Sequence, residues 1–152
     1  MEDRNRIEIT AIQEIDLPQL AYLQSELINE KADMQRMQNI LSVILKDNNY
    51  CLLGAKKNGQ LVGSLVCIVC HDLFGKCIPF MIVENMIVTK QLQGQGIGSM
   101  LMEEVEKIAK SRSCRYITLV SSAKRKKAHR FYLGCGFESQ NYKAFKKYID
   151  GR

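Results

Sequence analysis

Three glycines within five residues restrict the fold of this chain more than any other feature. The segment is Gln93-Gly94-Gln95-Gly96-Ile97-Gly98-Ser99. It follows an apolar run at 80–89 and precedes a helical pattern over 97–110, which predicts a strand, a loop and a helix. Glycine tolerates positive φ and lets the backbone approach a ligand, while a helix N-terminus presents unsatisfied N–H groups. The segment therefore predicts a phosphate cradle.

Two familiar phosphate loops do not fit this spacing. A P-loop has a lysine after its last glycine, whereas Gly98 is followed by Ser99-Met100. A dinucleotide-binding fold has Gly-x-Gly-x-x-Gly early in the chain and an acid about 20 residues later. Here the glycines alternate, arrive late, and the next apolar run ends in Val120-Ser121-Ser122. Both classes are excluded.

The rest of the chain predicts strands interleaved with helices in one domain spanning 1–152, an α/β layer structure. Asn58-Gly59 indicates a hairpin turn, and Asp16 before Pro18 is a candidate helix cap. The predicted strands are 6–12, 50–56, 61–70, 80–89, 116–120 and 138–148. The predicted helices begin near Pro18 and at Met34 and cover 97–110 and 126–133, with a loop at 71–79.

The net charge of +6 is concentrated in one segment. Residues 107–137 hold nine bases and no acid, whereas residues 1–50 hold nine acids and five bases. Such a block is a solvated face or a polyanion site. No aromatic side chains are interleaved with Lys124-Arg125-Lys126-Lys127, so we expect no nucleic-acid partner and a phosphate ligand instead.

The sequence also predicts where the protein is located and what its cysteines do. No apolar run approaches the ~18–20 residues of a membrane span, and the mixed charge of 1–6 is not that of a signal peptide. We expect a cytoplasmic protein whose six cysteines are reduced. Cys67 and Cys70 lie three apart in a predicted strand, on opposite faces, so we expect buried thiols, with no metal and no haem.

Two segments resemble the GNAT superfamily of N-acetyltransferases. Gln93-x-x-Gly96-x-Gly98, opening a helix after a strand, is similar to that family's loop for the acyl-CoA pyrophosphate. Ala128-His129-Arg130-Phe131-Tyr132-Leu133-Gly134-Cys135-Gly136-Phe137 resembles its Ala-x-x-Phe-Tyr-x-x-x-Gly-Phe pattern. The resemblance covers about residues 6–149. It implies a mixed, mostly antiparallel central sheet flanked by helices, with strands four and five splayed, and acetyl-CoA as co-substrate.

The resemblance implies a set of coenzyme-binding residues. The backbone of Met86, Ile87 and Val88 would pair with the pantetheine arm. The pyrophosphate would lie on the loop formed by Gln93, Gly94, Gln95, Gly96, Ile97, Gly98 and Ser99. Arg125 stands where many members have an asparagine that contacts the coenzyme, which leaves that contact open.

The chemistry needs a base and an acid. Tyr132 matches the family tyrosine that protonates the departing thiolate. Where some members carry a glutamate on the fifth strand, this chain has Val120. Glu84 is the alternative: by strand alternation we expect it to share a face with Met86 and Val88. Glu84 either takes the amine proton, directly or through water, or anchors a cationic substrate.

We therefore expect transfer of an acetyl group from acetyl-CoA to a primary amine by direct attack, with the oxyanion held by the N–H of Met86 or Ile87. The acidic first third favours a small cationic acceptor. Acetylation of a protein N-terminus or lysine, and a non-catalytic CoA-binding regulatory module, stay open. So does the oligomeric state, a homodimer included.

Overall fold

The computed structural model describes residues 6–28 and 30–151, which divide into two compact units, 1–119 and 120–152. The described strands all belong to the first unit: β1 (Ile7–Ala11), β2 (Tyr50–Lys57), β3 (Gln60–Cys70), β4 (Phe80–Val88) and β5 (Ile117–Thr118). Its helices are α1 (Leu17–Ser25), α2 (Met34–Ile44) and α3 (Ile97–Ser111), with short 3-10 turns η1 (Glu14–Asp16) and η2 (Lys90–Leu92). The second unit contains α4 (Lys126–Gly134). The expectation of one domain stays a prediction.

The five strands form one sheet in the order β1-β2-β3-β4-β5. The first four are antiparallel to their neighbours, and β5 runs parallel to β4. That last pair is short, since it joins only Met81 to Ile117 and Ile82 to Thr118. A mixed, mostly antiparallel sheet whose fourth and fifth strands separate is the predicted fold, and it is confirmed.

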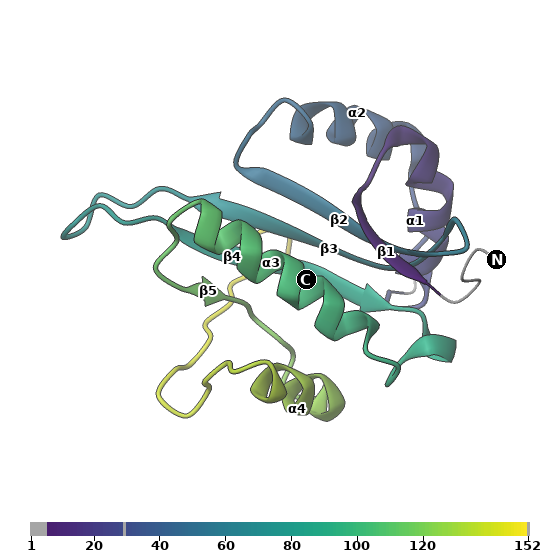
Figure 1. Ribbon diagram of the computed structural model, residues 1–152. Helices are drawn as coiled ribbons and strands as arrows, with labels where there is room; N and C mark the ends of the chain where they lie inside the picture. The colour runs from purple at the N-terminus through teal and green to yellow at the C-terminus, as the bar shows by residue number, and fades with distance from the viewer. Residues whose placement is uncertain (1–5, 29, 152) are drawn as a thin grey trace. The chain divides into compact units, whose positions relative to one another are not determined.

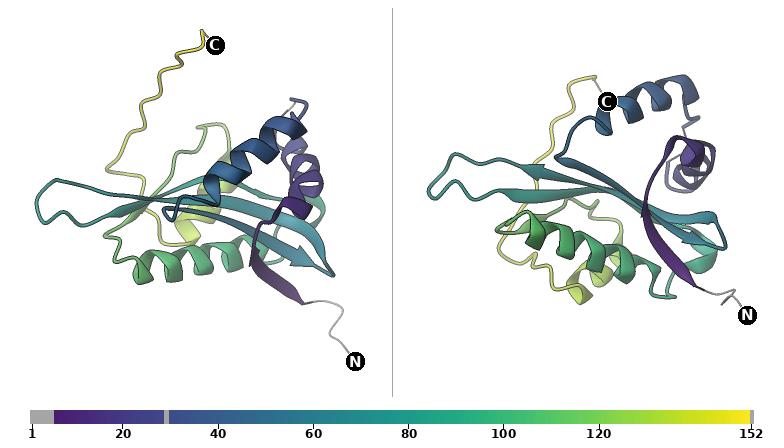
Figure 2. Two further views of the ribbon diagram at one scale, coloured as in Figure 1. Left: turned by 90° about the horizontal axis from the view of Figure 1, so that it is seen from above. Right: turned by 45° about the horizontal axis from the view of Figure 1, so that its top comes forward.

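Two hairpins build the centre of this sheet, and a local sequence pattern determines the turn of the first. Asn58 and Gly59 turn β2 into β3 with φ of 52° and 77°. Positive φ at both central residues is the geometry of a type I′ turn, which Asn-Gly favours. The loop over 71–79 that joins β3 to β4 extends beyond the sheet (Figure 2), and Leu73 within it is 95% exposed.

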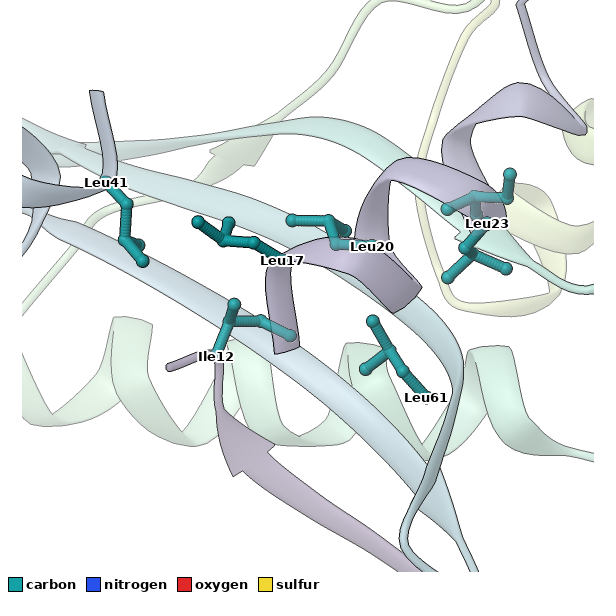
Figure 3. Close-up of a cluster of buried hydrophobic side chains, with 7 residues drawn as sticks. Ile12, Leu17, Leu20, Leu23, Leu41 and Leu61 are labelled. Atoms are coloured by element: carbon teal, nitrogen blue, oxygen red, sulfur yellow. The ribbon is translucent and has the colours of Figure 1, made fainter. Parts of the chain in front are cut away.

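Helices cover both faces of the sheet: α1 and α2 lie on one, and α3 lies on the other (Figure 1). The α1/α2 side is filled by a cluster of leucines and isoleucines (Figure 3). Its members are Ile12, Leu17, Leu20, Leu23, Leu41, Leu61 and Ile87. On the other side, Ile97, Leu101 and Val105 of α3 are each at most 2% exposed. Burying one such side chain contributes about 1.5–3 kcal/mol, so both helix layers are held firmly.

Asp16 does not cap α1 as predicted. It has helical φ and ψ and makes no side-chain capping bond to that helix. Its carboxylate accepts from the N–H of Gln13 at 2.9 Å and pairs with Lys56 Nζ of β2 at 2.7 Å. Burial alone would raise the pKa of Asp16, but the hydrogen bonds and charge of these partners outweigh it and hold the pKa below its ordinary value. Asp16 therefore forms an ion pair with Lys56, 40 positions away in the sequence, instead of capping the adjacent helix.

The predicted strand at 138–148 is wrong, because the structure assigns no strand to these residues and all of them are exposed. Tyr142, Phe145 and Tyr148 recur every three positions, whereas a half-buried strand needs apolar residues every two. Successive aromatic residues would therefore point to opposite faces. Phe145 is 93% exposed.

Of the two cysteines predicted to be buried thiols, Cys67 is buried and Cys70 is only half-buried. Cys67 is fully buried in β3, opposite Cys51 of β2. Burial, and then the neighbouring Cys51 thiol, raise the pKa of Cys67 to about 12, so this thiol is inert at neutral pH. Cys77 in the β3–β4 loop is exposed. Core filling therefore explains Cys67 and does not explain Cys77.

Candidate functional site

The edge of β4 that faces β5 is open along most of its length. Pairing with β5 ends at Ile82, and no described strand pairs with this edge from Val83 to Val88. Backbone N–H and C=O groups along an unpaired edge can take an extended ligand as an added strand. The predicted coenzyme-binding residues Met86, Ile87 and Val88 lie in this open stretch.

A β-bulge interrupts β4 and changes which side chains share a face. Glu84 lies opposite Val66 and Ile87 lies opposite Ser64, so two β4 residues lie between positions that only Leu65 separates on β3. Asn85, within the bulge, has φ of 54°. Bulges of this kind redirect side chains and leave backbone groups unpaired.

The bulge overturns the expected face of Glu84. Directly paired residues share a face, and Ile87 packs with the α1/α2 cluster, so Glu84 projects on that side. Val88 lies opposite Gly63, where a Cβ would stand 3.3 Å from Leu101 of α3. Glu84 and Val88 are therefore on opposite faces, because simple alternation fails across one extra residue. Glu84 is exposed.

The glycine segment has the geometry of an anion cradle. Gly94 and Gly96 have φ of 79° and 85°, and a Cβ at either would have no protein atom within 4 Å. Gly96 is the N-cap residue of α3, and its carbonyl oxygen accepts from the N–H of Met100 at 3.0 Å. The preceding N–H groups, from Ile97 to Ser99, have no intrahelical acceptor and point outward with the positive end of the helix dipole. Open space and converging donors fit a pyrophosphate.

Two side chains fasten the chain between β4 and this cradle. Gln93 Nε2 donates to Val88 O at 3.0 Å. Glu26, directly after α1, accepts from Thr89 Oγ1 at 2.8 Å and from the Lys90 N–H at 2.9 Å. The family resemblance implies a contact with the coenzyme for Gln93, whereas nothing in the sequence indicates the role of Glu26.

In the second unit, the end of the 128–137 motif forms the C-terminal cap of α4. Gly136 has φ of 87°, its N–H donates to Leu133 O at 3.0 Å, and the Phe137 N–H donates to Tyr132 O at 3.1 Å. These two bonds make a Schellman motif, in which glycine takes the left-handed position and the next residue packs back on the helix. The Phe137 ring meets the Tyr132 ring edge-on at 5.9 Å.

Tyr132 and Arg125 occupy the two ends of α4. Tyr132 is 9% exposed and also meets Phe131 edge-on at 5.3 Å. Arg125 is the exposed N-cap residue of the helix. His129 Nε2 donates to Ser122 O at 2.8 Å, which closes the turn before the helix and engages this ring nitrogen.

Two features of the site had different signals in the sequence. Asparagine adopts positive φ more readily than most residues, so Asn85 inside an apolar strand could have indicated the bulge. Glu26 had no such signal, because its partners lie 63 and 64 positions away.

The family is shown by comparison with known proteins. The model of the Acetyltransferase (GNAT) family matches residues 10–137, and the chain belongs to this family. An aminoalkylphosphonate N-acetyltransferase of Salmonella typhimurium is 29% identical over 120 residues, covering 78% of this chain and 76% of that protein. The protein is accordingly an acetyl-CoA-dependent acyltransferase.

Solved structures agree on the fold. A transcriptional regulator from Bacillus halodurans C-125 has a TM-score of 0.88 at 25% identity, over 95% of this chain and 100% of that one. AAC(6')-Iy in complex with the bisubstrate analog CoA-S-monomethyl-acetylneamine has a TM-score of 0.79 at 18% identity, over 94% and 98% of the two chains. The second likeness shows the fold alone.

Neither a metal site nor a membrane-spanning helix is found in the described part of the chain. Within residues 6–28 and 30–151, no group of three or more His, Cys, Asp or Glu side chains is placed to hold a metal ion. The helices of the same ranges include none with both the length and the apolar character of a membrane span.

Proposed function

We propose that the protein moves the acetyl group of acetyl-CoA to the primary amine of a small, positively charged acceptor. The observation that carries the proposal is the pairing of the open β4 edge with the glycine cradle in one unit. An extended thioester arm suits the edge, and a pyrophosphate suits the N–H groups from Gly94 to Ser99.

The positive charge of the acceptor is supported by Glu84 more than by the acidic first third of the chain. Asp16 pairs with Lys56, and Glu26 binds Thr89 and Lys90, so both carboxylates serve the protein itself. Glu84 is exposed on the α1/α2 side of β4. A carboxylate there attracts an ammonium group and can take its proton.

Three groups would carry the reaction. Glu84, or water next to it, takes a proton from the amine, whose ordinary pKa is about 10.4. The amine nitrogen then bonds to the acyl carbon while a β4 N–H, of Met86 or Ile87, holds the carbonyl oxygen. As the carbon–sulfur bond breaks, the Tyr132 hydroxyl gives its proton to the sulfur. The nitrogen, now bonded to the acyl carbon, loses its second proton to the Tyr132 phenolate through water, which restores the hydroxyl and leaves a neutral amide.

A second acceptor class has its own support. The Salmonella relative is named for aminoalkylphosphonates, which carry a primary amine and an anionic phosphonate. The phosphonate of such an acceptor would need a positively charged side chain to bind it, whereas a diamine would need a second carboxylate.

An acceptor panel tests the proposal. The full chain is incubated with acetyl-CoA and with a diamine, an aminoglycoside, an aminoalkylphosphonate or a lysine-containing peptide, and free thiol is followed. We expect the highest kcat/KM with the diamine or the aminoglycoside. A clear preference for the phosphonate supports the second candidate, and a preference for the peptide indicates protein acetylation. CoA binding without thiol release for any amine indicates a regulatory module.

A further inference from the structure

Glu26 bonds to the segment that leads from β4 into the glycine cradle, although it lies far from that segment in the sequence. Its two carboxylate oxygens bind two consecutive residues, Thr89 Oγ1 at 2.8 Å and Lys90 N at 2.9 Å. Glu26 follows directly after α1, and its partners are the first residues after β4. One acidic side chain thereby joins the helix layer of the α1/α2 face to the start of the cradle.

The two bonds act at the point where the chain changes direction. Thr89 is extended, with φ of −52° and ψ of 137°, and Lys90 begins η2. The N–H at the start of such a turn has no partner inside it, so the Glu26 carboxylate caps η2 from a distant part of the sequence. Thr89 is held on its other side as well, because its N–H donates to Val62 O at 2.9 Å.

Only Gln93 separates η2 from Gly94, so the backbone conformation that is fixed at Thr89 and Lys90 also determines where the cradle lies. Gln93 Nε2 returns to Val88 O and closes the turn. Glycine loses more backbone entropy on ordering than any other residue, so Gly94 and Gly96 make that segment costly to order without such supports. Hydrogen bonds to a charged carboxylate are the stronger kind, so Glu26 is the larger of the two supports.

We propose that Glu26 is a positioning residue: through Thr89 and Lys90 it presets the cradle for the coenzyme pyrophosphate. This inference rests on the proposed use of the cradle for acetyl-CoA. The contacts of Glu26 are with Thr89 Oγ1 and the Lys90 N–H, so it acts on the cradle through these two residues. Its contribution therefore falls on coenzyme affinity and leaves the chemical step alone.

The test compares Glu26→Ala with Glu8→Gln, which removes an exposed acid of β1 away from the loop. We expect Glu26→Ala to raise the Kd for CoA about tenfold, the scale of one lost charge-assisted network. Saturating kcat and the KM of the acceptor stay within about twofold of wild type, and Glu8→Gln changes nothing. Calorimetry gives the Kd, and thiol release gives the rates.

A truncated thioester separates positioning from general stability. S-acetylpantetheine lacks the pyrophosphate, so kcat/KM with this substrate should be the same in Glu26→Ala and wild type. An equal loss with both thioesters, or a loss in kcat alone, overturns the inference. Failure of the proposed function has a different signature, because wild-type protein would then not bind CoA or not release thiol.

Partial variants keep the test decisive should Glu26→Ala be unstable. Glu26→Gln keeps one acceptor oxygen, and Thr89→Val removes one donor at nearly constant shape, so each should raise the Kd for CoA by less than Glu26→Ala. The double variant Thr89→Val/Glu26→Gln should raise the Kd for CoA by less than the product of the two single fold-changes, because both substitutions act on one contact. Full additivity contradicts the assigned contact.

Discussion

The two segments that resemble the family motifs use their glycines in opposite ways. In the 93–99 loop, Gly94 and Gly96 adopt positive φ, a Cβ at either would meet open space, and the following N–H groups point outward. In the α4 segment, Gly136 adopts the same φ, but its N–H and that of Phe137 are used by the helix's own carbonyls. The first arrangement leaves donors for a ligand, whereas the second satisfies them internally. Two segments that both resemble family motifs can therefore differ in what their glycines do: one leaves N–H groups free for a ligand, and the other uses them to end a helix.

Tyr132 gives the largest expected effect and could break this comparison. Capping and ring packing explain why an aromatic residue stands at 132, but they do not require a hydroxyl. Tyr132→Phe keeps the ring contacts with Phe131 and Phe137. If the hydroxyl is the general acid, kcat falls about 100-fold while the KM for acetyl-CoA stays constant. An unchanged kcat would assign the whole α4 motif to folding.

Gly96 tests the ligand-facing side of the comparison. In Gly96→Ala the new methyl group occupies the open space of the cradle, and φ of 85° adds strain of about 1–2 kcal/mol. We expect the Kd for CoA to rise about 30-fold. Gly59→Ala is the matched control, since Gly59 also has positive φ and open space but lies in the β2–β3 turn. If both variants weaken CoA binding equally, the cradle assignment is wrong.

Glu84 lies exposed on β4, the strand with the open edge, so it tests the proposed acceptor side of the site. If Glu84 is the base, Glu84→Gln removes it and keeps the side chain's shape, so kcat/KM should fall about tenfold, because water can replace part of the proton transfer. The pH profile of kcat/KM should also lose its acidic inflection. The matched variant Glu103→Gln removes an exposed acid of α3 and should leave both unchanged. A parallel rise in acceptor KM with an intact pH profile would make Glu84 a substrate anchor.

Local patterns predicted the features that depend on neighbours in sequence. Asn58-Gly59 predicted the turn, and the Gln93–Ser99 segment predicted a loop opening a helix. Features that depend on distant partners were missed. Asp16 was taken for a cap because nothing near it indicates Lys56, and the contact of Glu26 with Thr89 spans 63 positions.

The site was predictable as a set of backbone groups but not as a set of side-chain directions. A strand with regular alternation would have placed Glu84 and Val88 together, whereas the bulge at Asn85 separates them. One extra residue reverses every face beyond it. The strand at 138–148 failed for a related reason, because its aromatic residues follow a period of three and define no single face.

The smallest effect distinguishes folding from function within α4. Gly136→Ala forces a Cβ into φ of 87° and should lower the free energy of unfolding by about 1–2 kcal/mol. Gly134→Ala, two positions earlier, falls within the helix, where a Cβ meets open space, and should raise it by about 0.5–1 kcal/mol. Urea denaturation measures both. Assayed far below the Tm, neither variant should change the KM for acetyl-CoA. An increase in that KM for Gly136→Ala, with stability unchanged, would mean that this glycine serves a ligand as Gly96 does, and the contrast between the two segments would fail.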